Sequence, residues 1–130
     1  MALMHVEVVS AEKQLLSVDV KALYARSLEG EIGILPGHQP ALIALDIAPV
    51  KVEFEDGHTE LVAVHNGFLF VGTDRVIVLA DTAELASEID IQRAESRVRE
   101  LEARLAEGED VAVRTSLTKH RIRLDVAAQA

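Results

Sequence analysis

Residues 29–40 read Glu-Gly-Glu-Ile-Gly-Ile-Leu-Pro-Gly-His-Gln-Pro and contain three of the seven glycines and two of the three prolines of the chain. Glycine suits positions that need a positive φ, whereas proline fixes φ and removes a hydrogen-bond donor. Between the two turns, residues 32–35 form an apolar run typical of a short buried strand. The stretch therefore predicts a tight corner in an all-β domain. Alternatively, the rigid turn presents the carboxylates of Glu29 and Glu31 to a partner.

Short apolar runs separated by turn residues extend on both sides of this stretch, from about residue 5 to residue 80. Residues 50–54 alternate between apolar and polar side chains, and residues 60–64 return after Asp56 and Gly57. An Asp-Gly pair tolerates the positive φ of a tight hairpin. A second hairpin is expected around Gly72. This spacing predicts about eight or nine strands in an antiparallel β-sandwich or flattened barrel.

Near residue 83 the apolar period changes from that of strands to that of helices. Apolar residues then recur at spacings of three and four, which is typical of one helix face: Ile91, Ala94, Val98, Leu101 and Leu105. We expect Asp90 to cap this helix, Gly108 to end it, and Asp110 to cap a second helix that ends near residue 128. The expected seam of the second helix is Val113, Leu117, His120 and Leu124, with Ile122 and Val126 beside it.

The chain is thus predicted to divide into a β-sandwich domain, residues 1–84, and a C-terminal antiparallel two-helix hairpin, residues 85–130. The formal net charge of −9 opposes binding to nucleic acid phosphates, and the few aromatic residues offer little stacking surface for single strands. Cysteine is absent, which excludes disulfides and thiolate metal sites. We find no transmembrane run and no signal or transit segment, so the chain is expected in the cytoplasm or on a membrane through a partner.

Charge is unevenly distributed along the chain. Residues 111–130 have a net charge of +3, which leaves −12 for the remainder. The basic residues of this tail are Arg114, Lys119, Arg121 and Arg123. A basic tail on an acidic body predicts an acidic partner for the tail, which is either another protein or the body itself. Alternatively, these basic residues have no partner and belong to a helix face that is exposed to water.

Catalytic and metal-binding motifs are missing from the sequence. The five histidines, at positions 5, 38, 58, 65 and 120, do not have the spacing of metal ligands, and we predict neither a catalytic residue nor a metal site. Residues 89–94 read Ile-Asp-Ile-Gln-Arg-Ala, with Glu84 upstream. They fit an ordinary helix cap. They also fit a small nucleotide site, because an arginine and helix N-terminal amides suit phosphate.

Residues 29–38 and the apolar run after them resemble the signature of the epsilon subunit of bacterial F-type ATP synthases. Residues 67–71 resemble that family's Gly-Gly-Phe strand, with Asn66 in place of one glycine, and residues 79–84 resemble its exit from the sandwich. The resemblance covers nearly the whole chain. It implies a non-catalytic rotor subunit of the central stalk, in which a sandwich precedes a helical hairpin.

Some bacterial members of this family bind ATP between their helices, and the resemblance extends to that motif. It implies a regulatory ATP site, with or without magnesium, formed by Glu84, Ile89, Asp90, Arg93, Ala94, Arg121 and Arg123. Glu100 stands where those members carry a further arginine, and the second helix is less alanine-rich than theirs.

The resemblance also implies partners: the gamma subunit, the c-ring, and the catalytic beta and alpha subunits. The residues implied to contact gamma and the c-ring are Glu29, Gly30, Glu31 and His38. The residues implied to block ATP hydrolysis on the beta subunit are Arg114, Lys119, Arg121 and Arg123. The expected location is the cytoplasmic face of the bacterial inner membrane, where the chain is held only through the complex. The implied role of that complex is proton-driven ATP synthesis. The alternatives are a free-standing binding module whose hairpin forms a homodimer, and a small enzyme.

Overall fold

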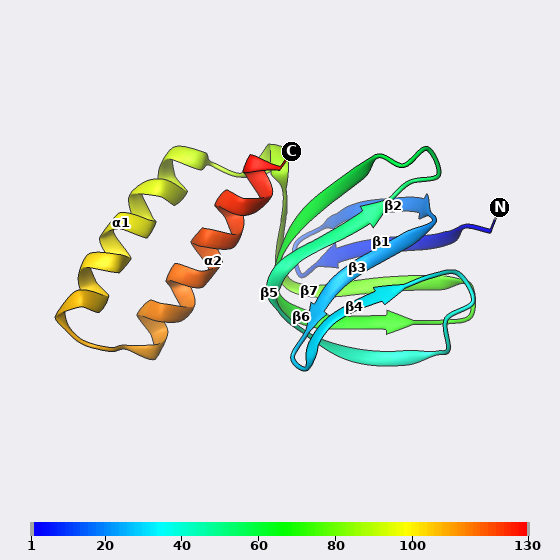
Figure 1. Cartoon of the computed structure of the whole chain (residues 1–130), viewed down its shortest axis with the longest axis horizontal. Helices are drawn as coiled ribbons and strands as arrows, with labels where there is room; N and C mark the ends of the chain where they lie inside the picture. The colour runs from blue at the N-terminus through cyan, green and yellow to red at the C-terminus, as the bar shows by residue number, and fades with distance from the viewer. Residues whose placement is uncertain (1, 130) are drawn as a thin grey trace.

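The computed structural model describes residues 2–129 and has a β-sandwich with a helical hairpin at one side (Figure 1). Its strands are β1 (Met4–Ser10), β2 (Gln14–Val20), β3 (Ala22–Ser27), β4 (Gly30–Ile34), β5 (Ala41–Glu53), β6 (Thr59–Val71) and β7 (Arg75–Leu85). After them come the 3₁₀ helix η1 (Ala86–Glu88) and the helices α1 (Ile91–Glu107) and α2 (Val111–Ala128). The predicted order, a sandwich followed by a helical hairpin, is confirmed.

The seven strands of the described chain form one sheet in the order β2-β1-β7-β6-β5-β3-β4. The long strands β5 and β6 curve so that the sheet folds over onto itself (Figure 1). Five of the six strand pairs in residues 2–129 are antiparallel, as expected. The pair of β1 and β7 is parallel, with His5 opposite Arg75 and Ser10 opposite Ala80. This pair joins the first and last strands of the sandwich.

The strand number is lower than the expected eight or nine because two pairs of apolar runs merge. Residues 41–45 and 50–54 contribute to the single strand β5, and residues 60–64 and 67–71 both lie in β6. Asn66 and Gly67 have φ values of 65° and 138°, so β6 bends there without ending. A side chain at Gly67 would clash with the carbonyl oxygen of Leu79 and lie 2.8 Å from the Cα of Ala80.

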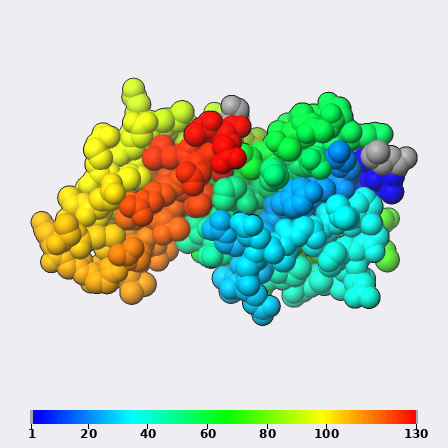
Figure 2. Space-filling model, in the orientation of Figure 1, coloured from blue at the N-terminus to red at the C-terminus, as the bar shows by residue number. Residues whose placement is uncertain are grey.

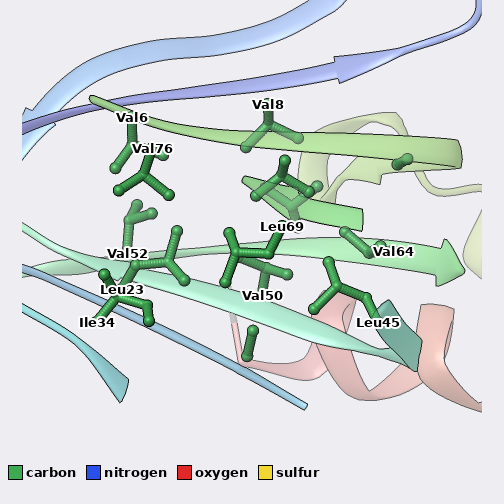
Figure 3. Close-up of a cluster of buried hydrophobic side chains, with 14 of the residues drawn as sticks. Val6, Val8, Leu23, Ile34, Leu45, Val50, Val52, Val64, Leu69 and Val76 are labelled. Atoms are coloured by element: carbon green, nitrogen blue, oxygen red, sulfur yellow. The ribbon is translucent and has the colours of Figure 1, made fainter. Parts of the chain in front are cut away.

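Alternate residues of the strands fill the space between the two layers of the sandwich (Figure 3). The side chains labelled there are Val6, Val8, Leu23, Ile34, Leu45, Val50, Val52, Val64, Leu69 and Val76. The run at residues 32–35 supplies Ile34 to this core, but Leu35 is 57% exposed because β4 ends before it. The corner predicted at residues 29–40 is therefore β4 and the turns at its two ends.

Both helices begin directly after the aspartates that were expected to cap them. The side chain of Asp90 accepts a hydrogen bond from the backbone nitrogen of Arg93 at 3.0 Å, and Asp110 accepts one from Ala112 at 2.9 Å. Gly108 ends α1. None of the helices within residues 2–129 has the length and apolar character needed to cross a membrane.

The buried face of the hairpin differs from the prediction at Ile91 in α1 and at His120 and Leu124 in α2, the last two being only half-buried. Ile91 is 47% exposed, whereas Ile89, just before the cap, is buried. The buried face of α2 changes along its length because α2 lies between α1 and the sandwich (Figures 1 and 2). Its first half packs Val113 and Leu117 against α1, in a cluster with Leu101. Its second half packs Ile122 and Val126 against the sandwich, in a cluster with Ile47, Ala63 and Ile89.

The bend at Gly67 predicts a large effect of a small substitution. Gly67→Ala introduces both backbone strain and a clash with β7, so we expect a loss of about 3 kcal/mol or more in the free energy of unfolding. Gly57→Ala is the matched control, because Gly57 also has a positive φ, 94°, but its absent Cβ would meet open space. Urea denaturation of both variants tests this, and equal losses would contradict the role of the clash.

Candidate functional site

A polar hollow of about 500 Å³ lies where the end of β7, the start of α1 and the middle of α2 meet. Its walls are formed by Glu84, Glu88, Asp90, Arg93, Ala94, Ser116, Lys119, His120 and Arg123. This volume falls in the range of small-molecule sites. The hollow brings together five of the residues implied for a nucleotide site: Glu84, Asp90, Arg93, Ala94 and Arg123.

Two other residues implied for that site lie elsewhere. Ile89 is buried in the apolar cluster between α2 and the sandwich. Arg121 is directed to α1, where its Nη2 lies 3.1 Å from Oε2 of Glu102. Positions 121 and 123 are roughly 200° apart around a helix, so they cannot face the same hollow. Arg123 is the residue that faces it.

Three residues of α2 line the hollow and were missing from the predicted nucleotide site: Ser116, Lys119 and His120. Together with Arg123 they follow the spacing three, one and three, which places all four on one helix face. This helical period is the sequence signal that places Ser116, Lys119 and His120 beside Arg123.

Glu84 is at the centre of the polar contacts that join α2 to the sandwich. Its Oε1 accepts a hydrogen bond from Nε of Arg123 and lies 3.3 Å from Nε2 of His65 on β6. Nη1 of Arg123 also lies 3.2 Å from Nδ1 of His120. Because a guanidinium only donates, Nδ1 of His120 accepts this bond and the ring carries its hydrogen on Nε2.

Burial and neighbouring cations disfavour the charged form of both histidines. Burial, assisted by Arg123 and Lys119, lowers the pKa of His65 to about 4, although the hydrogen bond to Glu84 opposes this shift. Burial also lowers the pKa of His120, and Arg123 adds to this effect. The imidazolium form is disfavoured in each case because it would lose hydration and face a positive charge.

The carboxylates of the hollow are already occupied by contacts within the chain. Glu84 binds Arg123, Glu88 binds Lys13 of the β1–β2 turn, and the side chain of Asp90 caps α1. Lys13 and the backbone nitrogen of Leu85 lower the pKa of Glu88. Arg93 and Lys119 have no ion pair within residues 2–129, so the hollow offers cationic donors to an anion.

The described residues hold no arranged metal site, and one histidine-centred set of contacts lies outside the hollow. No group of three or more His, Cys, Asp or Glu side chains in residues 2–129 is placed to hold a metal ion. Nδ1 of His5 lies 2.8 Å from Oδ1 of Asp19, and Nε2 of His5 lies 3.1 Å from Oγ of Ser17. A Ser-His-Asp triad connects its three residues in the same order. However, the side chain of Asp19 is 66% exposed on the edge strand β2, where water weakens such contacts.

The residues implied to contact the rotor and the c-ring lie at opposite ends of β4. Glu29 lies in the β3–β4 turn, and Gly30 and Glu31 are the exposed first residues of β4; Oγ of Ser27 donates to the carbonyl of Gly30 at 2.8 Å. Gly30 has a φ of 133°, which favours glycine. His38 lies beyond the other end of β4, in the turn before β5. The fold therefore presents two separate surfaces instead of one loop.

Three of the four basic residues of α2 have acidic partners inside the chain. Arg114 binds Glu109, Arg121 binds Glu102, and Arg123 binds Glu84. These pairs connect α2 to the interhelical connection, to α1 and to the sandwich, respectively. In this conformation the acidic body is thus the partner of the basic tail.

Comparison with known proteins identifies the family. A family model described as the β-sandwich domain of the ATP synthase delta/epsilon chain matches residues 3–86. An ATP synthase epsilon chain of Streptomyces avermitilis is 46% identical over 111 residues, covering 85% of this chain and 87% of the relative. An epsilon chain of Bacillus licheniformis is 40% identical over 131 residues, covering 98% of this chain and 99% of the relative.

Solved structures agree with these sequence relationships. A chain of the Euglena gracilis mitochondrial ATP synthase, in a structure of OSCP, F1 and c-ring, superposes with a TM-score of 0.73 at 25% identity, covering 98% of this chain and 79% of that one. A chain of the Tetrahymena thermophila central stalk and c-ring shares the fold, with a TM-score of 0.56 at 14% identity. The chain therefore belongs to the ATP synthase delta/epsilon family. Within that family it groups with the epsilon chains, which are subunits of an enzyme complex.

The contacts of His120 predict how its pKa responds to substitution. Arg123→Leu removes the nearest cation and should raise the pKa of His120 toward its ordinary value of 6.5. Arg121→Leu is the matched control, because Arg121 is directed to Glu102 on α1. The pKa is measured by following the histidine ring signals with pH in NMR spectra. An unchanged pKa in Arg123→Leu would contradict the assigned contact.

Proposed function

We propose that this chain is a non-catalytic rotor subunit of the central stalk, which couples the catalytic head to the membrane c-ring during proton-driven ATP synthesis. The sandwich docks on the gamma subunit, and the Glu29–Glu31 turn faces the polar loops of the c-ring. The full-length relationship to epsilon chains supports this role, as does the exposed, rigid β3–β4 turn. In this role the chain reaches the cytoplasmic face of the bacterial membrane only through the complex.

We propose further that the hairpin is a regulatory element that inhibits ATP hydrolysis when it leaves the sandwich. The observation that carries this proposal is the internal pairing of α2, in which Arg114, Arg121 and Arg123 bind carboxylates of the chain itself. When the hairpin leaves the sandwich, Arg123 loses its partner Glu84, and when α2 also separates from α1, Arg121 loses Glu102. Both arginines can then bind acidic segments of the catalytic beta subunits. The docked state and the inhibitory state therefore differ in which carboxylates these cations bind.

Removal of α2 tests the inhibitory role. Deletion of residues 111–130 should leave the sandwich folded, because its core cluster contains no residue of α2. The assembled ATP synthase should then hydrolyse ATP faster. The measurement is steady-state ATP hydrolysis of the complex with the full-length or shortened chain. Unchanged hydrolysis, with the shortened chain present in the complex, would rule out inhibition by α2.

ATP is the proposed ligand of the hollow, and it would hold the hairpin in the docked state. Arg93 and Lys119 offer donors to phosphates, while Glu88 and Asp90 stand beside them. The hollow is walled by Glu84 of β7 as well as by residues of α1 and α2, so a ligand that contacts all three elements binds the arrangement with the hairpin on the sandwich more tightly than the released one. Its binding therefore shifts the equilibrium toward docking.

Arg93 provides a direct test of ATP binding. Arg93→Ala should weaken binding by roughly tenfold to a hundredfold, because it removes a charge-assisted hydrogen bond to phosphate. Arg99→Ala is the control, since Arg99 is also an exposed arginine of α1 but does not line the hollow. Calorimetric titration of the isolated chain with ATP, with and without magnesium, gives the affinities. Equal affinities for the native chain and Arg93→Ala would contradict this placement of the phosphates.

A further inference from the structure

His65 lies on the face of the sandwich that α2 covers. Residues two apart along a strand share a face, and Ala63 packs against Ile122 and Val126 of α2. Ile47, which pairs with His65 across β5 and β6, belongs to the same cluster. The side chain of His65 is only 1% exposed. Departure of α2 would therefore give water access to this imidazole.

The hydrogen bonds of His65 fit only its neutral form. A carboxylate accepts, so Nε2 of His65 carries a hydrogen toward Oε1 of Glu84. The other ring nitrogen, Nδ1, is buried without a partner among the described residues. Protonation would place a second N–H at that position, and a buried donor without an acceptor is unfavourable.

Charged groups from each neighbouring element act on His65 in the docked state. Strand β7 contributes Glu84, helix α2 contributes Arg123 and Lys119, and β5 contributes the apolar Ile47. The single carboxylate is already bound to Arg123. A protonated His65 would compete with Arg123 for Glu84 and would repel its guanidinium.

We propose that His65, Glu84 and Arg123 form an acid-opened latch, in which protonation of His65 releases α2 from the sandwich. Closed, the latch consists of a neutral His65 that donates to Glu84 while Glu84 holds Arg123. Open, it consists of an imidazolium that reaches water and retains Glu84, with Arg123 free to leave with α2. The latch is a property of the isolated chain and does not depend on nucleotide binding.

Proton linkage gives the direction and size of the effect. The pKa of His65 is about 4 in the docked state and returns toward 6.5 when α2 leaves. Between these values the released state binds more protons, so docking is strongest above pH 6.5 and weakens as the pH falls toward 4. The ratio of released to docked chains should rise roughly thirtyfold between pH 7.5 and 5.0.

A distance measurement on the full chain tests the latch. The chain has no native cysteine, so Thr73→Cys on the sandwich and Thr115→Cys on α2 can carry two spin labels. Both positions are exposed. Pulsed electron paramagnetic resonance should show one docked distance at pH 7.5 and a longer distance that grows at pH 5.0. NMR methyl signals of the sandwich core report that the sandwich stays folded.

His65→Gln separates the latch from other effects of acid. Glutamine can still donate to Glu84 but does not titrate, so this variant should remain docked at both pH values. His58→Gln is the matched control: it removes a histidine from the β5–β6 turn and should release α2 as the native chain does. Equal release in His65→Gln and the native chain, or no release of the native chain at pH 5.0, would overturn the proposal.

A second measurement covers the case in which His65→Gln does not dock at all. Ring nitrogen shifts of the native chain report the tautomer and the pKa of His65 directly. An Nε2–H tautomer that remains neutral down to pH 5 in the docked chain supports the latch. A pKa at or above 6.5 in the docked chain would overturn it, because protonation would then not favour release.

Discussion

The position of the hairpin depends on the carboxylate of Glu84 at the end of β7. This single group binds the guanidinium of Arg123 on α2 and receives a hydrogen bond from the buried His65 on β6. It therefore connects the helical part to the sandwich at the only polar contact that α2 makes with a strand in residues 2–129. Together with the apolar cluster around Ile122 and Val126, this ion pair sets which face of α2 meets the sandwich.

Most of the fold could be predicted because its signals are local. Asp90 and Asp110 cap their helices, and Asp56 and Gly57 form the predicted hairpin turn. The merging of strand runs into β5 and β6 could not be predicted in this way, since a bend at Asn66 looks like a turn in sequence. The exposure of Ile91 could not be predicted either, because the position of α2 decides which face of α1 is buried.

The candidate site was predictable where its residues are close in sequence and unpredictable where they come from different elements. Asp90, Arg93 and Ala94 form one motif at the start of α1. Arg123 could be separated from Arg121 only once the face of α2 was known, because both are basic and equally plausible in sequence. His65 gives no sequence signal at all, since its burial depends on the second half of α2, more than fifty residues away in the chain.

The two halves of α2 belong to separate apolar clusters, one with α1 and one with the sandwich. The pairing of the helices therefore does not share side chains with the attachment of the hairpin. A substitution at Ile122 or Val126 therefore weakens the attachment of the hairpin to the sandwich, while the sandwich core and the helix pair keep their own apolar contacts.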